Sequence, residues 1–303
     1  MIEDKYLIVI GGPTAVGKTS TSIALAQHLD CDIISADSRQ FYREMEIGTA
    51  KPSKEELSQA THHFIDSLSI HDEFSVGKFE SETITLLETL FKEKSHCILT
   101  GGSGLYLNAI VNGLDKFPDI APSYRAELNE EFKKDGFSNL LKELSERDTE
   151  YFAKVDQQNP QRIIRALEII RATGKPFSSF LRREPIQRPF KSILFKLEME
   201  REILYERINT RVDIMLNQGL KEEAKSLFPL RHLNALRTVG YSEWFDFFES
   251  KIGEDKAIEL IKRNSRRYAK RQITWFKNQG DYQAIAQDDK ALNKIVQKLA
   301  DFA

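Results

Sequence analysis

The sequence predicts an α/β protein in which helices flank a parallel sheet, with a small all-helical domain inserted between two strands. Three observations support this prediction. Short apolar runs that are typical of buried strands alternate with longer helix-compatible segments. The first apolar run, residues 6–10, ends in a glycine-rich turn that a helical segment follows at once. Strand-like runs are missing from residues 115–189, where six prolines separate amphipathic segments.

The elements follow in order along the chain. Strands are expected at residues 6–10, 32–36, 97–100 and 192–197. Helices are expected at 17–29, 201–218 and 255–279, and nearly everything after residue 198 is expected to be helical. Residues 1–114 and 190–303 should therefore form the core, and residues 115–189 the helical insertion.

Composition indicates an ordinary globular protein. Of the 303 residues, 41% are hydrophobic and 30% are charged. The two cysteines, Cys31 and Cys97, lie in or beside apolar runs and are expected to be buried thiols rather than disulfide or zinc ligands. We find neither a basic leader nor an apolar run long enough to span a membrane, so no membrane contact and a cytoplasmic location are expected. Nothing demands more than a monomer.

Residues 12–19 match the phosphate-loop pattern G-x-x-x-x-G-K-[ST] in its required context, after a strand and at the start of a helix. Backbone N–H groups of such a loop surround phosphate oxygens, the lysine adds a full positive charge, and the hydroxyl after it can bind Mg²⁺. The pattern indicates a diphosphate or nucleotide site that uses Mg²⁺, and it does not single out ATP. The expected ligands are Gly12, Pro13, Thr14, Ala15, Val16, Gly17, Lys18 and Thr19, with Thr19 as the metal ligand.

Asp37 follows the second predicted strand. Because the carboxyl ends of parallel strands share one edge of the sheet, its carboxylate should face the phosphate loop. There it could accept a proton from a nucleophile or hold Mg²⁺ through water. The equally weighted alternative is a helix N-cap, which is a common role for aspartate after a strand.

The third predicted strand argues against a motor ATPase or GTPase. Those proteins normally place an acid at the end of a second strand to hold Mg²⁺. Here the run at 97–100 continues into Gly-Gly-Ser-Gly at 101–104. That turn has two readings, a close approach to a ligand or a tight connection to a helix, and glycines alone do not choose between them.

Six segments together resemble one family. They are GPTAVGKT at 12–19, DIISADSRQFYREMEIGTAKP at 32–52, LTGGSGLYLNAIVNGL at 99–114, NPQRIIRALEI at 159–169, RTVGYSE at 237–243 and KRQITWFK at 270–277. In this order they resemble the tRNA dimethylallyltransferase family, also called tRNA isopentenyltransferase, over nearly the whole chain. Eukaryotic members carry a C-terminal zinc finger that these 303 residues lack, so the bacterial form is expected.

The resemblance implies a P-loop NTPase-like core and a prenyl transfer reaction. The family moves a dimethylallyl group from dimethylallyl diphosphate to N6 of the adenosine just 3′ of the tRNA anticodon. The phosphate loop would hold the leaving diphosphate with Mg²⁺, and the carboxylate would take the N6 proton. The implied catalytic residues are Asp37, Thr19, Lys18 and Arg211, with Arg207 as a weaker candidate on the same helix face.

The resemblance also implies contacts to the anticodon stem-loop of tRNA. The matching positions are Asp37, Ser38, Arg39, Gln40, Ser103, Arg125, Gln161, Arg162, Ile163, Ile164, Arg165, Arg237, Gly240, Tyr241, Lys270, Arg271, Gln272 and Trp275. Residues 262–277 hold seven lysines and arginines, no acid and three aromatic residues, a mixture suited to phosphates and unstacked bases. The alternative is a surface helix with its aromatics in the core. Arg182, Arg183 and Arg188 are expected to let the insertion clamp the stem, unless the insertion is a plain scaffold.

Two rival functions stay open from the residues alone. A nucleotide or small-molecule kinase would use ATP at the phosphate loop but would leave the basic aromatic C-terminal helix without a purpose. A non-catalytic RNA-binding ATPase would bind tRNA whether or not Asp37 keeps its carboxylate. Transfer of label from dimethylallyl diphosphate to tRNA separates both from the family reaction.

Overall fold

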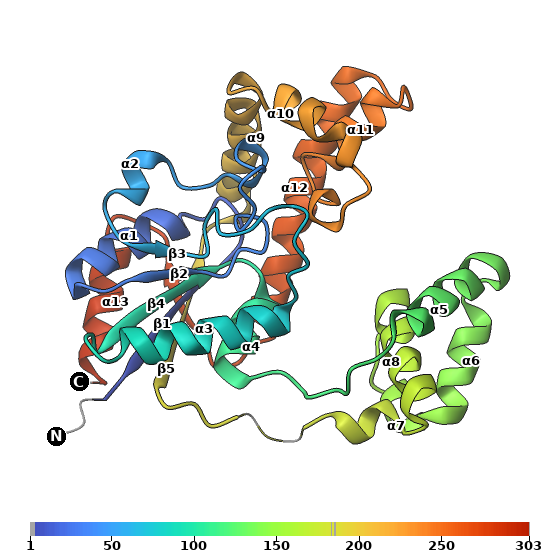
Figure 1. Cartoon of the computed structure of the whole chain (residues 1–303). Coiled ribbons are helices and arrows are strands. Elements are labelled where there is room, and N and C mark those ends of the chain that lie inside the picture. Colours follow the sequence, from blue (N-terminus) through green and yellow to red (C-terminus); the bar gives the residue numbers. More distant parts are fainter. Residues whose placement is uncertain (1–3, 183, 185, 303) are drawn as a thin grey trace. The chain divides into compact units, whose positions relative to one another are not determined.

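The computed structural model describes residues 4–182, 184 and 186–302 (Figure 1). The chain separates into two compact units. The larger contains the described residues up to 112 and from 187 onward, and the smaller contains those between 113 and 186. These limits lie within two or three residues of the expected ones, 113 against 115 and 186 against 189.

A six-stranded sheet in the order β3-β2-β4-β1-β5-β6 forms the centre of the larger unit, and every neighbouring pair is parallel. Its strands are β1 (Tyr6–Gly11), β2 (Ile33–Ser35), β3 (His62–His63), β4 (His96–Gly101), β5 (Lys191–Glu198) and β6 (Gln283–Ala286). The four predicted strands are confirmed. The edge strands β3 and β6 were not predicted, because they are too short and too polar to form an apolar run.

Both faces of the sheet are buried, and in the central strand β1 every position is apolar or glycine and buried. In β1, Ile8 and Ile10 join a core under α1 (Lys18–Leu29), α9 (Arg201–Asn217) and α13 (Ala291–Ala300). Leu7 and Val9 point to the opposite core, which α3 (Val76–Leu90) and α4 (Gly104–Asn112) cover (Figure 1). Continuous apolar strands of this kind are typical of parallel sheets covered on both sides. Cys31 and Cys97 are buried in these cores, as predicted.

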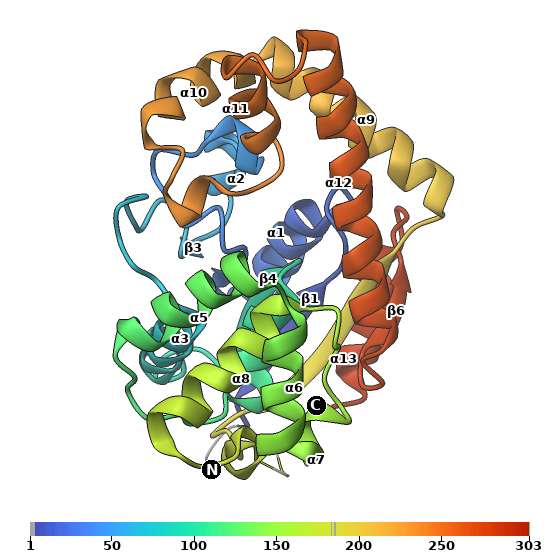
Figure 2. The same ribbon diagram turned by 90° about the vertical axis from the view of Figure 1, so that its right-hand side faces the viewer.

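A third core of the larger unit lies beyond the sheet, among helices from the last third of the chain. Its helices are α10 (Leu220–Leu227), α11 (Ser242–Phe248) and the first turns of α12 (Glu254–Lys277) (Figure 2). Fully buried Tyr241 and Trp244 fill its centre, together with Met45 from the segment after β2. The remaining short helices of the unit are η1 (Ile47–Thr49), α2 (Lys54–Leu57), η3 (Phe228–Leu230) and η4 (Asn234–Leu236).

The smaller unit is all-helical in its described part, as predicted. Its helices are α5 (Pro122–Asp135), α6 (Ser138–Arg147), α7 (Thr149–Phe152), α8 (Pro160–Thr173) and η2 (Phe177–Phe180). Helix α8 is the central element, with seven buried residues that face α5, α6 and η2. Arg171 joins the three long helices through paired hydrogen bonds to Glu131 and Glu143 at 2.5–3.0 Å. Neither this unit nor the rest of the described chain contains a helix long and apolar enough to cross a membrane.

The carboxyl ends of three adjacent strands carry the predicted functional segments. The phosphate loop follows β1, Asp37 follows β2, and the Gly-Gly-Ser-Gly turn follows β4. A parallel sheet brings such ends to one edge, which is where open α/β proteins bind ligands. The sheet and its loop together form the predicted P-loop NTPase-like core.

Candidate active site

The phosphate loop joins β1 to α1 through a turn that requires glycine. Gly12 and Gly17 have φ angles of 148° and 106°, which residues with side chains rarely adopt. A Cβ atom at Gly17 would also lie 2.8 Å from Nε2 of Gln287. Gly17 is the N-cap of α1 and offers no side chain to the first helical N–H groups. These amides, with the partial positive charge of the helix end, favour an anion.

Lys18 adds a full charge to the loop. Its Nζ donates hydrogen bonds to the carbonyl oxygens of Gly12 at 3.0 Å and Pro13 at 2.8 Å. Burial lowers the pKa of Lys18 to about 8; the charge of Asp37 opposes this decrease, and that of Arg211 adds to it. The loop carbonyls thus hold the ammonium group where an anion on the loop amides would meet it.

The lowered pKa of Lys18 predicts that anion binding weakens as the pH rises. Lys18 is charged below its pKa and loses its charge as the pH passes about 8. A bound diphosphate stabilises the charged form, so the dissociation constant of methyl diphosphate should rise roughly fivefold from pH 8 to pH 9. Titration calorimetry at several pH values measures this rise. A Lys18→Arg variant stays charged in this range and should show no such rise; the same rise in both proteins would contradict the assignment.

Asp37 holds a turn and also faces the site. Its Oδ1 accepts a hydrogen bond from the N–H of Arg39 at 3.0 Å, but residues 38–41 form a turn and not a helix, so the expected alternative, a helix N-cap, is wrong. The same side chain lines two cavities of the larger unit. The hydrogen bond within the turn therefore fixes the direction of a carboxylate that stays accessible to both cavities.

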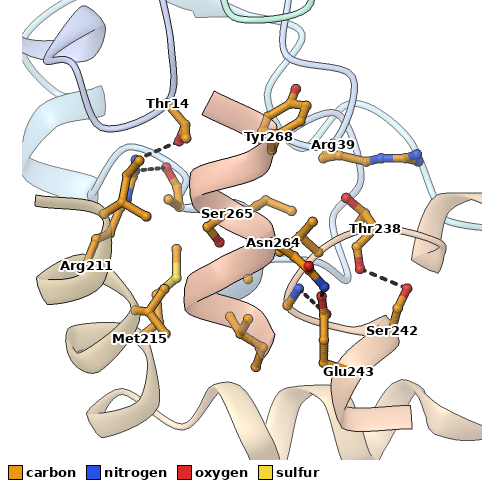
Figure 3. A pocket seen from close by; sticks show the side chains of 18 of the residues that line it. Thr14, Arg39, Arg211, Met215, Thr238, Ser242, Glu243, Asn264, Ser265 and Tyr268 are labelled. Atoms are coloured by element: carbon orange, nitrogen blue, oxygen red, sulfur yellow. Dashed lines mark hydrogen bonds between the residues drawn. The ribbon is translucent and has the colours of Figure 1, made fainter. Parts of the chain in front are cut away.

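These two cavities meet at one wall. The first, here the α12 cavity, has a volume of about 660 Å³ and lies between α9, α12 and residues 237–243 (Figure 3). The second, the loop cavity, has a volume of about 600 Å³ and contains the phosphate loop from Thr14 to Ser20. The residues that line both are Thr14, Asp37, Thr49, Arg211 and Tyr268. Molecules bound in the two cavities would meet beside Asp37.

Arg211 contributes a cation to this shared wall. Its guanidinium donates to Oγ1 of Thr14 at 3.4 Å and to the carbonyl oxygen of Ala50 at 3.2 Å (Figure 3). Burial lowers the pKa of Arg211, the charge of Asp37 opposes this decrease, and an arginine stays protonated nonetheless. Arg207, one turn earlier on α9, is exposed and lines the loop cavity but not the α12 cavity.

Most predicted tRNA contacts in the larger unit are accessible. The α12 cavity is lined by Ser38, Arg39, Arg237, Gly240 and Arg271. Gln40 lines the loop cavity, Lys270 is exposed on α12, and Ser103 is partly exposed. Trp275 is half-buried against Gly104, where an added Cβ atom would lie 2.3 Å from the indole ring. The structure thus gives Trp275 a packing role beside any contact with RNA.

Four of the predicted tRNA contacts have buried side chains, and contact with RNA at these positions stays a prediction. Tyr241 is fully buried, and its hydroxyl donates to Glu223 at 2.6 Å. Ile163 and Ile164 belong to the core of the smaller unit. Gln272 is 6% exposed and contacts the backbone of the phosphate loop. Each lies in a segment that was matched as a whole, and the match did not reveal which way its side chain faces.

The arginines of the insertion are largely paired. Arg125 donates to Glu168 at 3.2 Å and to Gln161 at 3.0 Å, and Arg165 approaches Glu168 to 3.1 Å. Arg162 is exposed on the first turn of α8.

The predicted clamp is not supported as stated. Arg182 pairs with Asp115 within the smaller unit. Arg188 belongs to the larger unit, where its side chain is 10% exposed and forms a salt bridge with Glu80 at 2.5 Å. It also donates hydrogen bonds to the carbonyl oxygens of Ala109 and Ile110 near the end of α4. Arg183 lies outside the described residues.

Sequence reasoning missed two carboxylates that shape the cavity walls. Glu243 is buried and accepts hydrogen bonds from the N–H of Gly240 at 2.9 Å and from Asn264 at 2.7 Å (Figure 3). Glu223 on α10 accepts bonds from the N–H groups of Ile47 at 2.8 Å and Gly48 at 3.0 Å, which places the neighbouring Thr49 in the shared wall. Gly240 lies only three residues before Glu243, but Asn264 is 21 residues away and the partners of Glu223 are 175 and 176 residues away, so the sequence alone does not connect them.

The fold and the site define a P-loop enzyme with two cavities that share a carboxylate and a cation. A family model described as "IPP transferase" matches residues 40–279 of the chain. The chain belongs to this family.

Curated and solved relatives cover most of the chain. It is 55% identical to a tRNA dimethylallyltransferase of Flavobacterium psychrophilum over 278 residues, 90% of this chain and 91% of the relative. The crystal structure of a tRNA isopentenylpyrophosphate transferase from Bacillus halodurans is 38% identical, with a TM-score of 0.72 over 98% of this chain and 95% of that one. A eukaryotic dimethylallyltransferase described as acting on tRNA is 26% identical, with a TM-score of 0.83 over 98% of this chain and 79% of that one.

Proposed function

We propose that this chain transfers a dimethylallyl group from dimethylallyl diphosphate to N6 of the adenosine just 3′ of the anticodon in tRNA. The observation that carries the proposal is the wall shared by the two cavities, where Asp37, Thr14 and Arg211 meet. Family membership and relatives named tRNA dimethylallyltransferase support the same reaction. A tRNA acceptor fits an enzyme that works in the cytoplasm.

The loop cavity suits the donor. Its loop amides and Lys18 provide the partners that a diphosphate needs, and Arg211 adds a second cation at the shared wall. The prenyl group would then extend from the diphosphate toward Asp37.

The α12 cavity suits the acceptor. Arg39, Arg237 and Arg271 line it and would attract the phosphates of an anticodon loop. Tyr268 presents an aromatic ring at the shared wall, on which an unstacked base could lie. The target adenine must leave its stack to reach the wall, as is general for enzymes that act on a base.

The proposed reaction is a single substitution. The N6 nitrogen forms a bond to C1 of the dimethylallyl group while the bond from C1 to the diphosphate oxygen breaks. The diphosphate leaves with the electron pair, and the Asp37 carboxylate takes the proton that N6 loses. Lys18 and Arg211 stabilise the charge that develops on the leaving group, where such stabilisation accelerates the reaction most.

We propose Mg²⁺ as the cofactor on the basis of the donor set in the loop cavity. The Thr19 hydroxyl and the Asp37 carboxylate line it together, and no group of three or more histidine, cysteine or acidic side chains in the described chain could hold a metal unaided. Mg²⁺ commonly takes few protein ligands and completes its shell with phosphate oxygens and water. Bound there, it would neutralise charge on the diphosphate.

Label transfer tests the proposed function. Purified protein should move label from dimethylallyl diphosphate into unmodified tRNA in the presence of Mg²⁺, and nuclease digestion should recover the label on one adenosine. A tRNA with guanosine at that position is the matched control and should remain unlabelled. Turnover of ATP without transfer of label would instead favour a kinase or an RNA-binding ATPase.

The α12 cavity also yields a prediction for Arg271, which is exposed and lies over the ring of Tyr268 at 5.6 Å. Replacing it with alanine should weaken binding of an anticodon stem-loop and lower the slope of log K against log salt by about one, because one phosphate contact is lost. Fluorescence anisotropy over a range of salt concentrations measures the slope. Lys256→Ala removes an exposed cation from the first turn of the same helix and should leave the slope unchanged; equal slopes for all three proteins would exclude Arg271 as a phosphate contact.

A further inference from the structure

Helix α12 has two functional faces. Lys270 and Arg271 are exposed on one of them. Gln272 and Phe276 are buried on the other, which packs on the carboxyl ends of β1 and β4. The face that carries Gln272 is therefore turned toward the phosphate loop and away from solvent.

The Gln272 carboxamide bridges two loops of the site. Its Oε1 accepts a hydrogen bond from the N–H of Thr14 at 2.8 Å, and its Nε2 donates to the carbonyl oxygen of Gly102 at 3.0 Å. A carboxamide offers the acceptor and the donor that these two backbone groups require. Glutamine thus joins the phosphate loop after β1 to the Gly-Gly-Ser-Gly turn after β4.

The space around this bridge leaves little freedom. A Cβ atom at Gly102 would lie 2.1 Å from Nε2 of Gln272. Thr14, the residue held by Oε1, also receives the Arg211 guanidinium at its hydroxyl and lines both cavities. The carboxamide therefore fixes the part of the phosphate loop that separates the two proposed substrates.

We propose that Gln272 is a positioning residue for the donor: it holds the phosphate loop in the shape that binds the diphosphate and does not contact tRNA. The proposal rests on the proposed function, in that it takes the loop to bind a diphosphate. Loss of the carboxamide frees the Thr14 amide and lets the loop adopt other arrangements, so part of the binding energy is spent on ordering it. Donor binding should weaken while tRNA binding stays the same.

The test compares Gln272→Met with the wild type. Methionine has a similar length and can neither donate nor accept as a carboxamide does, so the dissociation constant of methyl diphosphate should rise roughly tenfold. The affinity for an anticodon stem-loop should stay within about twofold, a pattern that general destabilisation does not produce. Arg271→Ala on the exposed face should give the opposite pattern. Thr274→Ala, which removes a hydroxyl that donates to the carbonyl oxygen of Lys270 within α12, serves as the control for helix stability.

A second variant tests the same bridge from its other end. Gly102→Ala retains Gln272 and displaces its carboxamide, and it should raise the same dissociation constant by a similar factor. If Gln272→Met does not fold, the Gly102→Ala variant alone tests whether the carboxamide positions the phosphate loop. Unchanged methyl diphosphate binding in the folded variants, or a loss confined to the stem-loop, would overturn the proposal. If the wild type itself fails to bind methyl diphosphate, the proposed donor site is overturned and this inference with it.

Discussion

Replacing Asp37 with asparagine should lower kcat for dimethylallyl transfer by about two to four orders of magnitude. Asparagine keeps an oxygen that can accept the bond from the N–H of Arg39, so the turn after β2 should retain its shape. It cannot take a proton from the attacking N6 group. The adenine amine is a weak nucleophile because its lone pair is delocalised into the ring, so the reaction depends on this proton acceptor.

Single-turnover kinetics with saturating donor and tRNA isolate this chemical step from binding. The variant should bind the anticodon stem-loop about as tightly as the wild type and should have a similar melting temperature. Arg43→Ala, at an exposed position later in the loop after β2 that lines neither cavity, is the control for local disturbance and should lose far less activity. A rate near that of the wild type in the asparagine variant would reduce Asp37 to its structural role in the turn after β2.

The second large effect is expected for Lys18→Met, which removes the ammonium group and keeps most of the side-chain volume. Because Lys18 would contact the diphosphate before and during its departure, kcat/KM for the donor should fall by about three orders of magnitude. Most of the loss should appear in kcat, since charge on the leaving oxygen grows as the bond breaks.

Steady-state assays with varied dimethylallyl diphosphate separate the two constants. The affinity for the stem-loop should not change, because Lys18 lines only the loop cavity. Lys92→Met, which removes an exposed lysine after α3, is the control for the loss of one positive charge from the protein surface. A fall in tRNA affinity, or no fall in kcat/KM, would contradict a donor site at this loop.

The central fold was predictable because its cause is local. The runs that became β1, β2, β4 and β5 contain apolar residues at successive positions, and this pattern can be recognised without knowing which strands pair with them. Strands β3 and β6 exist because a neighbouring strand offers a free edge, so their short sequences carry almost no sign of them. The start of α1 followed from the phosphate-loop pattern itself.

The residues of the site were likewise predictable where their signal is local and not where it depends on distant partners. The phosphate loop and Asp37 lie in continuous segments whose order and spacing indicate their chemistry. Glu223 accepts bonds from backbone N–H groups up to 177 residues away, and Glu243 accepts one from Asn264, 21 residues away, so only the folded chain brings these partners together. Motif resemblance also did not reveal that Tyr241 and Gln272 are buried, because a segment that matches a binding motif contains residues that face inward as well as outward.

The contact between Glu223 and Tyr241 limits how this enzyme can change. One carboxylate accepts the tyrosine hydroxyl and the N–H groups of Ile47 and Gly48, and a Cβ atom at Gly48 would lie 2.5 Å from the tyrosine ring. Glu223, Tyr241 and the backbone at Ile47 and Gly48 are thereby tied to one another, although the proposed reaction uses none of these side chains. Attempts to adapt the enzyme to another RNA by altering Arg237 or Gly240 must leave these contacts intact or replace them together.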